Sequence, residues 1–507
     1  MMDPTRDDLT LGVVGTGTMG RGIAQVAAAG GLRVLLHDSR EGAADEAVAF
    51  IGKMLDRAEV KGRLPAGAAE AAQKRLEIVD RLAGLSSCQV VIEAVSEDLE
   101  VKRRLFRELE GVVDAGCVLA TNTSSLSVTS IAAACGRPER VGGLHFFNPV
   151  PLMALVEVVA GVHSAPWVTD ALMALGRRLG REPVRVADTP GFLVNQVGRG
   201  YTLEAAHLAG ERVADFATID RILRDQAGFP LGPFELMDLT GLDVSQPASE
   251  SIYRRSYDEP RYRPSALMGL RLEAGLLGRK TGRGFYSYDS GPAPAPEATP
   301  VPAYDGRPVW VSPAEPEAAQ ALAALIDRLG AKRDEGARPG AGSLILMTPL
   351  GEDATTAAVD QDLDPTRAVA IDTLFGLDRR RVVMKTPVGA PDTVAAAQGL
   401  LAQDGTPVSL LRDSCGFVAQ RVVATIVNIG SAVAQQAVAT PQDIDKAVTL
   451  GLGYPQGPLA FGDRLGPGKI LRVLEAMHRI TGDPRYRPSP WLTRRARLGV
   501  SLLTPED

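Results

Sequence analysis

Cysteine and histidine are scarce in this sequence of 507 residues, which has four of the first and five of the second. The cysteines, Cys88, Cys117, Cys135 and Cys415, form no CxxC pair, and no histidine is spaced to complete a metal site with them. Scattered cysteines of this kind are typical of reduced, buried thiols. We therefore predict that the chain binds no metal.

Long apolar runs and blocks of basic charge are also missing. No apolar run approaches the roughly 18 residues that a membrane-spanning helix needs, and the first ten residues, MMDPTRDDLT, are too polar and acidic for a signal peptide. The net charge of −6 is spread along the chain, which argues against nucleic acid or an anionic membrane as the main partner. With 45% hydrophobic and 23% charged residues, we expect a cytoplasmic globular protein of several domains.

A strand, a glycine-rich turn, a helix and a second strand are expected over residues 9–38. The apolar run LTLGVVG precedes GTGTMGRGIAQVAAAGG, which is rich in helix formers, and RVLLHD is a second apolar run. This order predicts a βαβ unit with GxGxxG at its first turn, where glycines let the backbone approach a pyrophosphate. The residues of the turn are Gly15, Gly17, Thr18, Met19 and Gly20. Such turns also occur for purely conformational reasons, so the motif alone does not establish a nucleotide site.

Asp38 strengthens the nucleotide interpretation. It ends the second strand of the unit, where a carboxylate accepts hydrogen bonds from ribose hydroxyls and repels a 2′-phosphate. The sequence therefore favours NAD over NADP, and only the nearby Arg40 weakens that preference.

Further strands are predicted at 89–95, 117–122 and 140–144, each preceded by a helix-compatible segment. Together they complete a doubly wound parallel sheet. The polar residues just past the carboxyl ends of these strands should face one crevice; they are Glu97, the residues 122–125 and His145.

The stretch GLHFFNPVPLMALVEVV, residues 143–159, contains a histidine and a carboxylate that could act together. A neutral imidazole suits proton abstraction from an alcohol, and a carboxylate can fix its tautomer. His145 is equally well explained as a packed or solvated residue at a strand end, and alternation alone would put Glu157 on a solvated face. The residues by themselves leave both interpretations open.

Residues 9–288 resemble the L-3-hydroxyacyl-CoA dehydrogenases at several separated motifs. These are GTGTMGRGIA, EAVSEDLEVKRRLF, TNTSSLSVTSIA, GLHFFNPVPLMALVEVV, DTPGFLVNQV and GRKTGRGFY. The resemblance implies an α/β Rossmann-like sheet followed by an all-α helical domain. It also implies reversible, NAD-dependent oxidation of a (3S)-3-hydroxyacyl-CoA to a 3-oxoacyl-CoA.

The resemblance assigns roles to particular residues. It implies that His145 is the base, that Glu157 orients it, and that Ser124 and Asn195 contact the C3 oxygen of the substrate. Besides the glycine turn, the implied cofactor contacts are Asp38, Glu97, Lys102, Asn148 and Lys280. A family lysine that meets the CoA phosphates falls near Lys61, with Met54 in place of a neighbouring serine.

Two of these cofactor assignments have simpler alternatives. Lys102 would otherwise be an exposed residue of its helix, and Asn148 would only begin the turn before Pro149.

The second half of the chain is a degenerate copy of the first. DTPGFLVNQV at 188–197 recurs as DSCGFVAQRV at 413–422, with Gln420 in place of Asn195, and no GxGxxG occurs between 306 and 400. We expect the two helical copies to pack as an internal pseudo-dimer, and a homodimer is a second option. The predicted domains are an NAD-binding domain at 1–187, a helical substrate and dimerisation domain at 188–288, a linker at 289–305, a partial α/β remnant at 306–411 and a second helical domain at 412–507.

The length and two-part plan resemble the long bacterial dehydrogenases of phenylacetate catabolism, which act on 3-hydroxyadipyl-CoA. Nothing in the sequence identifies a pocket for a terminal carboxylate, so 3-hydroxybutyryl-CoA is the alternative substrate. A fused hydratase is disfavoured because the repeat occupies the whole carboxyl half. A crystallin-like structural protein is disfavoured because the first copy keeps all four catalytic residues.

Overall fold

The computed structural model describes residues 6, 8–288, 291 and 300–506, which divide into two compact units. The first unit holds the residues up to Asn195 together with Gln436–Leu452, and the second holds Gln196–Gln435 and the residues from Gly453 onward. The predicted linker lies mostly outside the described residues. Of its described part, Tyr304 packs against the core of a sheet in the second unit.

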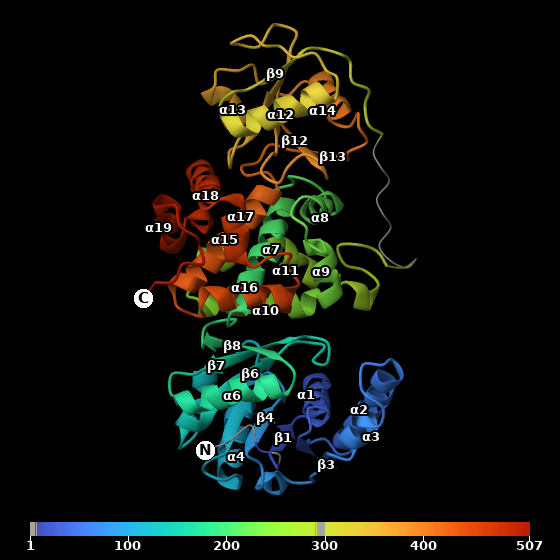
Figure 1. Ribbon diagram of the computed structural model, residues 1–507, viewed down its shortest axis with the longest axis vertical. Helices are drawn as coiled ribbons and strands as arrows, with labels where there is room; N and C mark the ends of the chain where they lie inside the picture. Colours follow the sequence, from blue (N-terminus) through green and yellow to red (C-terminus); the bar gives the residue numbers. More distant parts are fainter. Residues whose placement is uncertain (1–5, 7, 289–290, 292–299, 507) are drawn as a thin grey trace. The chain divides into compact units, whose positions relative to one another are not determined.

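A mostly parallel sheet forms the centre of the first unit (Figure 1). Its strand order is β3-β2-β1-β4-β5-β6-β7-β8, and every neighbouring pair is parallel except β6 and β7. The strands are β1 (Thr10–Val14), β2 (Arg33–His37), β3 (Leu76–Ile78), β4 (Val90–Glu93), β5 (Val118–Thr121), β6 (Val141–Phe146), β7 (Leu155–Ala160) and β8 (Glu182–Ala187). Fully buried apolar strands such as β1 are typical of a parallel sheet that helices cover on both faces.

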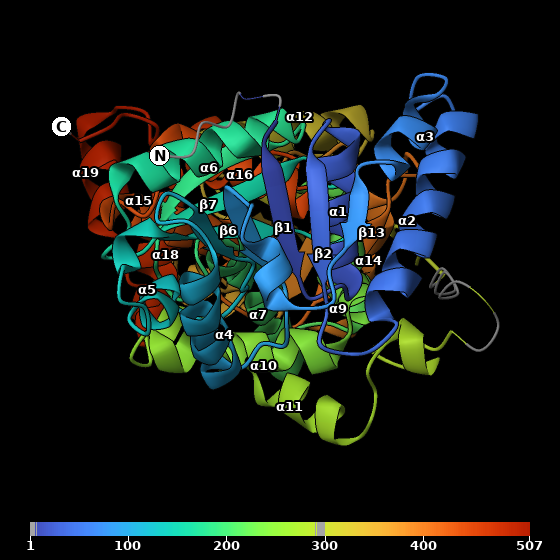
Figure 2. The same cartoon turned by 90° about the horizontal axis from the view of Figure 1, so that it is seen from below.

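Helices connect these strands as the βαβ pattern predicts, and Figure 2 shows β1 and β2 side by side. They are α1 (Thr18–Ala29), α2 (Ala43–Val60), α3 (Ala68–Gln73), α4 (Leu99–Val112), α5 (Val128–Ala132) and α6 (Pro166–Arg178), with 3₁₀ turns η1 (Leu82–Leu85) and η2 (Pro138–Arg140). Side-chain oxygens of Asp98 and Ser127 cap α4 and α5. The first unit also contains one helix from the second repeat. This helix, α16 (Pro441–Leu452), packs on β7 and β8.

Two sets of helices make up much of the second unit. The first set is α7 (Val194–Gly210), which begins at the end of the first unit, α8 (Phe216–Asp225), α9 (Pro233–Thr240), α10 (Leu242–Arg255) and α11 (Ala266–Glu273), with η3 (Pro260–Tyr262) and η4 (Arg279–Thr281). The second set is α15 (Ala419–Gln435), α17 (Pro458–Leu465), α18 (Pro467–Thr481) and α19 (Pro490–Leu498), with η5 (Pro484–Tyr486).

The two helical sets contact each other through the repeated PRYRPS segments. Arg263 of the first copy pairs with Asp483 of the second at 2.7 Å, and Arg487 of the second lies 3.7 Å from Glu259 of the first. Contacts that exchange equivalent residues in this way are characteristic of a twofold interface.

The second sheet repeats the carboxyl half of the first. Its order is β13-β12-β11-β10-β9, with β11 and β12 antiparallel and the other neighbours parallel. Its elements are β9 (Val309–Val311), β10 (Leu344–Met347), β11 (Ala368–Ile371), β12 (Arg381–Lys385) and β13 (Val408–Leu411), with α12 (Pro316–Arg328), α13 (Ala354–Asp360) and α14 (Pro391–Leu401). This arrangement matches β4 to β8, and the described residues contain no counterpart of β1 to β3.

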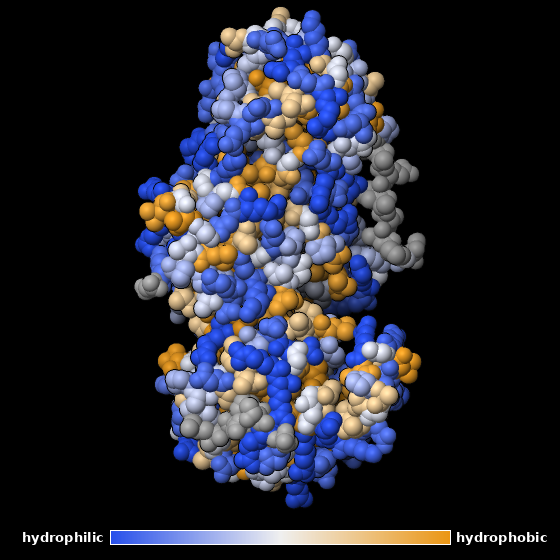
Figure 3. Space-filling view, viewed as in Figure 1, coloured by the Kyte–Doolittle hydropathy of each residue, from blue (hydrophilic) through white to orange (hydrophobic). Residues whose placement is uncertain are grey.

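The predicted fold class is therefore confirmed: a Rossmann-like sheet, helical domains and a second, smaller sheet. Hydrophilic residues predominate on the face drawn in Figure 3, with hydrophobic ones scattered among them. In the part of the chain that the structure describes, no helix is long and apolar enough to span a membrane.

Candidate active site

His145 and Glu157 face each other across the antiparallel strands β6 and β7. The imidazole Nδ1 lies 2.7 Å from Glu157 Oε2, and the two side chains are 6% and 0% exposed. His145 is the fifth residue of β6 and not, as expected, a residue beyond the strand end. The alternative of a solvated face for Glu157 is wrong, because β7 is covered on both sides.

The second carboxylate oxygen of Glu157 is held by the start of helix α7. Its Oε1 accepts hydrogen bonds from the backbone N–H groups of Leu193, at 3.1 Å, and Val194, at 2.9 Å. Backbone donors at a helix N-terminus orient a carboxylate that accepts them. The other oxygen of Glu157 can accept the Nδ1–H of His145, and this tautomer leaves Nε2 with the lone pair that a general base needs.

The residues around this pair come from the ends of neighbouring strands. The rings of Phe147 and Phe192 lie with centroids 4.6 and 5.7 Å from that of His145. Ser124 is exposed three residues past β5, which is the parallel neighbour of β6, and Asn195 is half-buried in the first turn of α7. Ser124 thus lies at the carboxyl edge of the sheet. Asn195 directly follows Leu193 and Val194, whose N–H groups bind Glu157.

The glycine turn has the geometry of a dinucleotide site. Gly15 has φ +90° and a Cβ there would lie 2.6 Å from Ala94 O, whereas a Cβ on Gly20 would lie 1.7 Å from Gly15 O. Gly17, at the start of α1, has no atom within 4 Å of its Cβ position. The first glycine therefore packs tightly on the residue that follows β4, the third packs tightly on the turn itself, and the second has open space beside it. That space suits a pyrophosphate against the helix N-terminus.

Asp38 is fixed beside this turn. Its Oδ2 accepts hydrogen bonds from Thr16 N and Oγ1 at 2.7 and 2.9 Å, and its Oδ1 accepts one from Arg40 N at 2.9 Å. Burial alone would raise the pKa of Asp38, but these hydrogen bonds outweigh it and hold the pKa below its ordinary value. The carboxylate is therefore oriented and ionised where a ribose would bind.

Glu97 and Lys102 belong to a hydrogen-bonded cluster at the ends of β4 and β5. Lys102 is 1% exposed and lies 2.6 Å from Glu93 and 3.4 Å from Glu97, so the alternative of an exposed lysine is wrong. Glu97 Oε1 accepts hydrogen bonds from Thr123 Oγ1 at 2.6 Å and Ser124 N at 2.9 Å. Burial opposes the ionisation of Glu97, but the hydrogen bond from Thr123 and the positive charge of Lys102 outweigh it and lower the pKa of Glu97. The cluster thereby ties Glu97 to the loop that carries Ser124.

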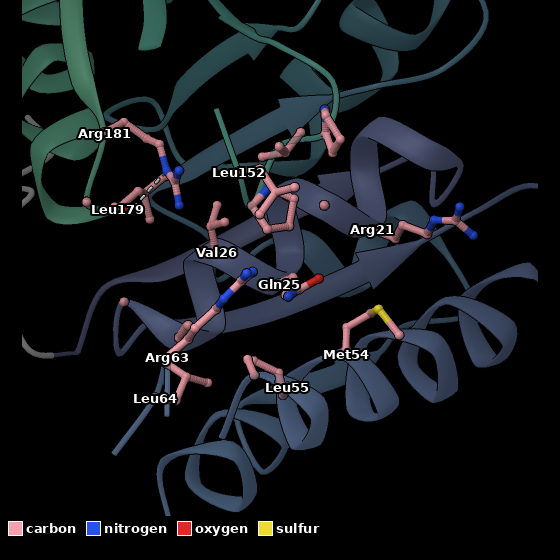
Figure 4. Close-up of a pocket in the computed structure, with 18 of the residues that line it drawn as sticks. Arg21, Gln25, Val26, Met54, Leu55, Arg63, Leu64, Leu152, Leu179 and Arg181 are labelled. Carbon is pink, nitrogen blue, oxygen red and sulfur yellow. Dashed lines mark hydrogen bonds between the residues drawn. The ribbon is translucent and has the colours of Figure 1, made fainter. Parts of the chain in front are cut away.

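A cavity of about 710 Å³ lies between α1, α2 and the loop that follows β6 (Figure 4). Asn148 and Lys61 both line it, together with Met54. Among its described lining residues none is acidic, and the basic ones are Arg21, Arg57, Lys61, Arg63, Arg178 and Arg181. Figure 4 shows Arg21, Arg63 and Arg181 on different sides of the space. Of these basic residues the sequence predicted only Lys61 as a contact to the CoA phosphates, although Arg57 and Arg63 lie within four residues of it.

Lys280 lies in the second unit, in the turn η4. Its Nζ forms an ion pair with Asp243 of α10, and both side chains are half-exposed. The structure thus gives Lys280 a protein partner within its own unit.

The family is identified by comparison with known proteins. The model of the 3-hydroxyacyl-CoA dehydrogenase NAD-binding domain matches residues 10–189, and that of the C-terminal domain matches both 191–288 and 416–501. The chain belongs to the 3-hydroxyacyl-CoA dehydrogenase family. It is an NAD-dependent oxidoreductase, and the second match shows that its helical domain is duplicated.

Relatives of this dehydrogenase differ in length. It is 39% identical to 3-hydroxyadipyl-CoA dehydrogenase of Escherichia coli K12, over 96% of this chain and 98% of the relative. A probable 3-hydroxybutyryl-CoA dehydrogenase of Deinococcus radiodurans is 38% identical over 55% of this chain and 100% of its own length. A crystal structure of 3-hydroxybutyryl-CoA dehydrogenase from Escherichia coli K12 superposes with a TM-score of 0.84 and 37% identity, covering 97% of this chain and 98% of that one.

Proposed function

We propose that His145 is the general base of this dehydrogenase and that Glu157 is its positioning residue. The observation that carries this proposal is the buried pair itself, in which a carboxylate held by two backbone N–H groups fixes the histidine tautomer. His145 Nε2 takes the proton of the substrate hydroxyl, and the imidazolium that forms is stabilised by Glu157. NAD⁺, when bound, accepts the hydride that leaves C3.

Ser124 and Asn195 are proposed to hold the C3 oxygen toward His145. Both carry short polar side chains that can donate a hydrogen bond to the oxygen in the alcohol and ketone states. The glycine turn, Asp38, Glu97, Lys102, Asn148 and Lys280 remain the proposed cofactor contacts. For the turn and Asp38 this proposal is supported by the open space at Gly17 and by the ionised carboxylate beside it.

The basic cavity is proposed to bind the phosphates of coenzyme A. A cavity whose described lining includes several arginines and Lys61 but no acidic residue is a favourable site for several negative charges. The cavity also reaches Asn148, three residues after His145, so the loop that lines it continues directly from the strand of the base. This arrangement supports a substrate whose nucleotide end lies in the cavity and whose acyl end reaches His145.

We propose 3-hydroxyadipyl-CoA as the substrate. The full-length relative in Escherichia coli carries that activity in its name, and it matches this chain in both repeats. The second candidate is 3-hydroxybutyryl-CoA, which is favoured by the name of the full-length solved structure.

Initial rates of NADH formation with the two CoA esters test this proposal. We expect a higher kcat/KM for 3-hydroxyadipyl-CoA, and a higher value for 3-hydroxybutyryl-CoA would favour the second candidate. In the same assay His145→Ala should lose kcat by orders of magnitude and still bind NADH. An unchanged kcat in this variant would remove His145 from the mechanism.

We further propose that the two helical copies form an internal pseudo-dimer. The reciprocal pairs Arg263–Asp483 and Arg487–Glu259 support this, since they exchange equivalent positions of the repeat.

A further inference from the structure

A second cavity, of about 480 Å³, lies within the second unit. Its walls come from the turn between α7 and α8 and from the carboxyl ends of strands β12 and β13. Its apolar lining includes Phe216, Leu410 and Leu411. None of its described lining residues has a role in the proposed reaction, so that reaction does not account for the cavity.

Three cations line this cavity without a partner of opposite charge. They are Arg212, two residues after α7, Lys385, the last residue of β12, and Arg412, which directly follows β13. Arg212 and Arg412 are exposed, and Lys385 is half-buried. Within the part of the chain that the structure describes, none of the three side chains forms an ion pair or a hydrogen bond. Like charges gathered around one space repel each other until an anion compensates them.

The carboxylates near the cavity do not neutralise these cations. Asp215 is the one acidic residue of the described lining, and its Oδ1 caps helix α8 by accepting a hydrogen bond from Thr218 N at 2.7 Å. Glu211 pairs with Arg421 at 2.7 Å, and Asp413 accepts hydrogen bonds from the start of α13. The lining therefore carries three positive charges and one negative, and this excess favours an anion.

The repeat shows that the backbone contact at Arg412 does not require an arginine. The N–H of Arg412 donates to Val213 O at 3.0 Å, and in the first unit the N–H of Ala187 donates to Val438 O at 2.8 Å. Both donors directly precede the repeated segments that begin with aspartate, DTPGF and DSCGF, so Ala187 corresponds to Arg412. The same contact thus forms with an alanine.

The other two cations also have apolar counterparts. The residue before each acceptor of these bonds has a positive φ, +60° at Arg212 and +52° at Ala437, so an alanine forms this turn as well. Lys385 corresponds to Val159 in the register that matches the two antiparallel strand pairs. All three cations therefore lie at positions where the fold accepts small or apolar side chains. Packing does not explain their charge, whereas binding of an anion does.

We propose that this cavity binds the phosphate group of a small molecule. A guanidinium binds two phosphate oxygens through parallel N–H donors, and an ammonium adds a compact positive charge. A phosphate monoester carries nearly two negative charges at pH 7, which matches the excess charge of the lining. The cavity volume falls in the range of roughly 300–1,000 Å³ that is usual for small-molecule sites, so the apolar walls leave room for an organic group. The site is independent of the proposed dehydrogenase reaction.

Titration calorimetry of the full chain with inorganic pyrophosphate and with AMP tests the proposal. Both probes carry phosphate, but only AMP has an organic group for the apolar walls. We expect AMP to bind the wild type more tightly, and tighter binding of pyrophosphate would identify free phosphates as the ligands of the same site. Arg212→Gln and Arg412→Gln should each weaken the binding roughly tenfold, since each removes hydrogen bonds between charged groups.

The controls separate this site from the anion sites proposed in the first unit. Saturating NADH in every titration occupies the glycine turn, and Lys61→Ala weakens only the basic cavity, so binding at the second cavity should persist in that variant. Arg379→Gln changes an exposed arginine of the second unit outside the described lining and should bind both probes like the wild type. Wild-type rates of NADH formation should show that the variants at residues 212, 379 and 412 are folded. If one variant at the cavity does not fold, Lys385→Gln provides the same test.

Several outcomes would overturn the phosphate site. A wild type that binds neither probe is the first. Binding that Lys61→Ala abolishes, or that neither Arg212→Gln nor Arg412→Gln weakens, would place the phosphate elsewhere in the molecule. Equal weakening by Arg379→Gln and Arg412→Gln would mean that only the overall charge of the unit attracts the probes. The dehydrogenase proposal would survive each of these results.

Discussion

In the proposed mechanism, Glu157 determines which nitrogen of His145 carries the proton. A glutamine at this position keeps an oxygen for the N–H groups of Leu193 and Val194 and then turns an N–H toward Nδ1. Such a contact favours the tautomer whose Nε2 is protonated and cannot act as a base. We therefore expect Glu157→Gln to lower kcat roughly 10²- to 10⁴-fold while NADH still binds.

Steady-state kinetics and NADH fluorescence titration measure these two effects. Glu182→Gln, an exposed change at the start of β8, is the matched control and should retain wild-type kcat. A Glu157→Gln variant with wild-type kcat would mean that the carboxylate charge is not needed to orient His145.

Lys61 lies at the end of helix α2 and lines the basic cavity. Lys61→Ala should raise KM for a 3-hydroxyacyl-CoA about 3- to 30-fold, because one charged contact to a phosphate is lost. The N-acetylcysteamine thioester of the same acyl group lacks the phosphates, so its KM should not change. Lys53→Ala, exposed on the same helix and outside the cavity, is the control. An equal rise of KM for both thioesters would place the phosphates elsewhere.

Asp220 joins three segments of the first helical set and makes its stability depend on pH. It accepts hydrogen bonds from the N–H groups of Phe234 and Glu235, at 3.0 and 3.1 Å, and from Tyr286 Oη, at 2.7 Å. Burial nevertheless raises its pKa to about 7. Between pH values of about 4 and 7 the folded state holds a proton that the unfolded chain has released. The free energy of unfolding therefore falls as pH rises through this range, by up to about 4 kcal/mol.

Asp220→Asn removes this titration, so its free energy of unfolding should decrease less between pH 5 and pH 8 than that of the wild type. Urea unfolding at the two pH values measures the difference, and Asp360→Asn, an exposed change, should follow the wild type. Identical pH dependence in the Asp220→Asn variant and the wild type would show that Asp220 does not bind the proton.

Local patterns predicted some of these elements, and others depend on pairing between distant segments. The βαβ unit and its glycine turn are encoded within some thirty residues, so periodicity and spacing predicted them. The position of His145 opposite Glu157 depends on the register of β6 and β7, which no local pattern determines. The burial of Lys102 likewise depends on its ion pair with Glu93. Glu93 lies in another segment, the strand β4, so the pattern of the helix that contains Lys102 does not predict this burial.

The two sheets have the same strand arrangement from β4 to β8 and from β9 to β13, so their residues can be compared position by position. If β10 is aligned with β5, the same shift of the chain aligns β11 and β12 with β6 and β7. His145 and Glu157 then correspond to Ile371 and Val383, which are opposite each other in the second hairpin. The second sheet thus replaces the polar pair by an apolar one, and the described residues contain no counterpart of the strands that surround the glycine turn.

The second repeat also packs against strand β7 of the first unit, through α16. A Cβ on Gly451 would lie 2.8 Å from Leu155 Cδ2 and 3.1 Å from Val194 Cγ1. Leu155 begins the strand of Glu157, and the N–H of Val194 binds Glu157. Gly451→Val should therefore destabilise the protein by about 1–3 kcal/mol through overpacking, and it should lower kcat because the shift reaches the support of Glu157.

Gly468→Val is the matched control, since Gly468 lies in a helix of the same repeat and has no atom within 4 Å of its Cβ position. Thermal unfolding and kcat with a 3-hydroxyacyl-CoA should separate the two variants. If Gly451→Val lost stability but kept its kcat, α16 would act only as a cover for β7 and β8. Joint loss of both is expected, because one of the side chains that must move away from residue 451 belongs to Val194, whose N–H holds the carboxylate in place.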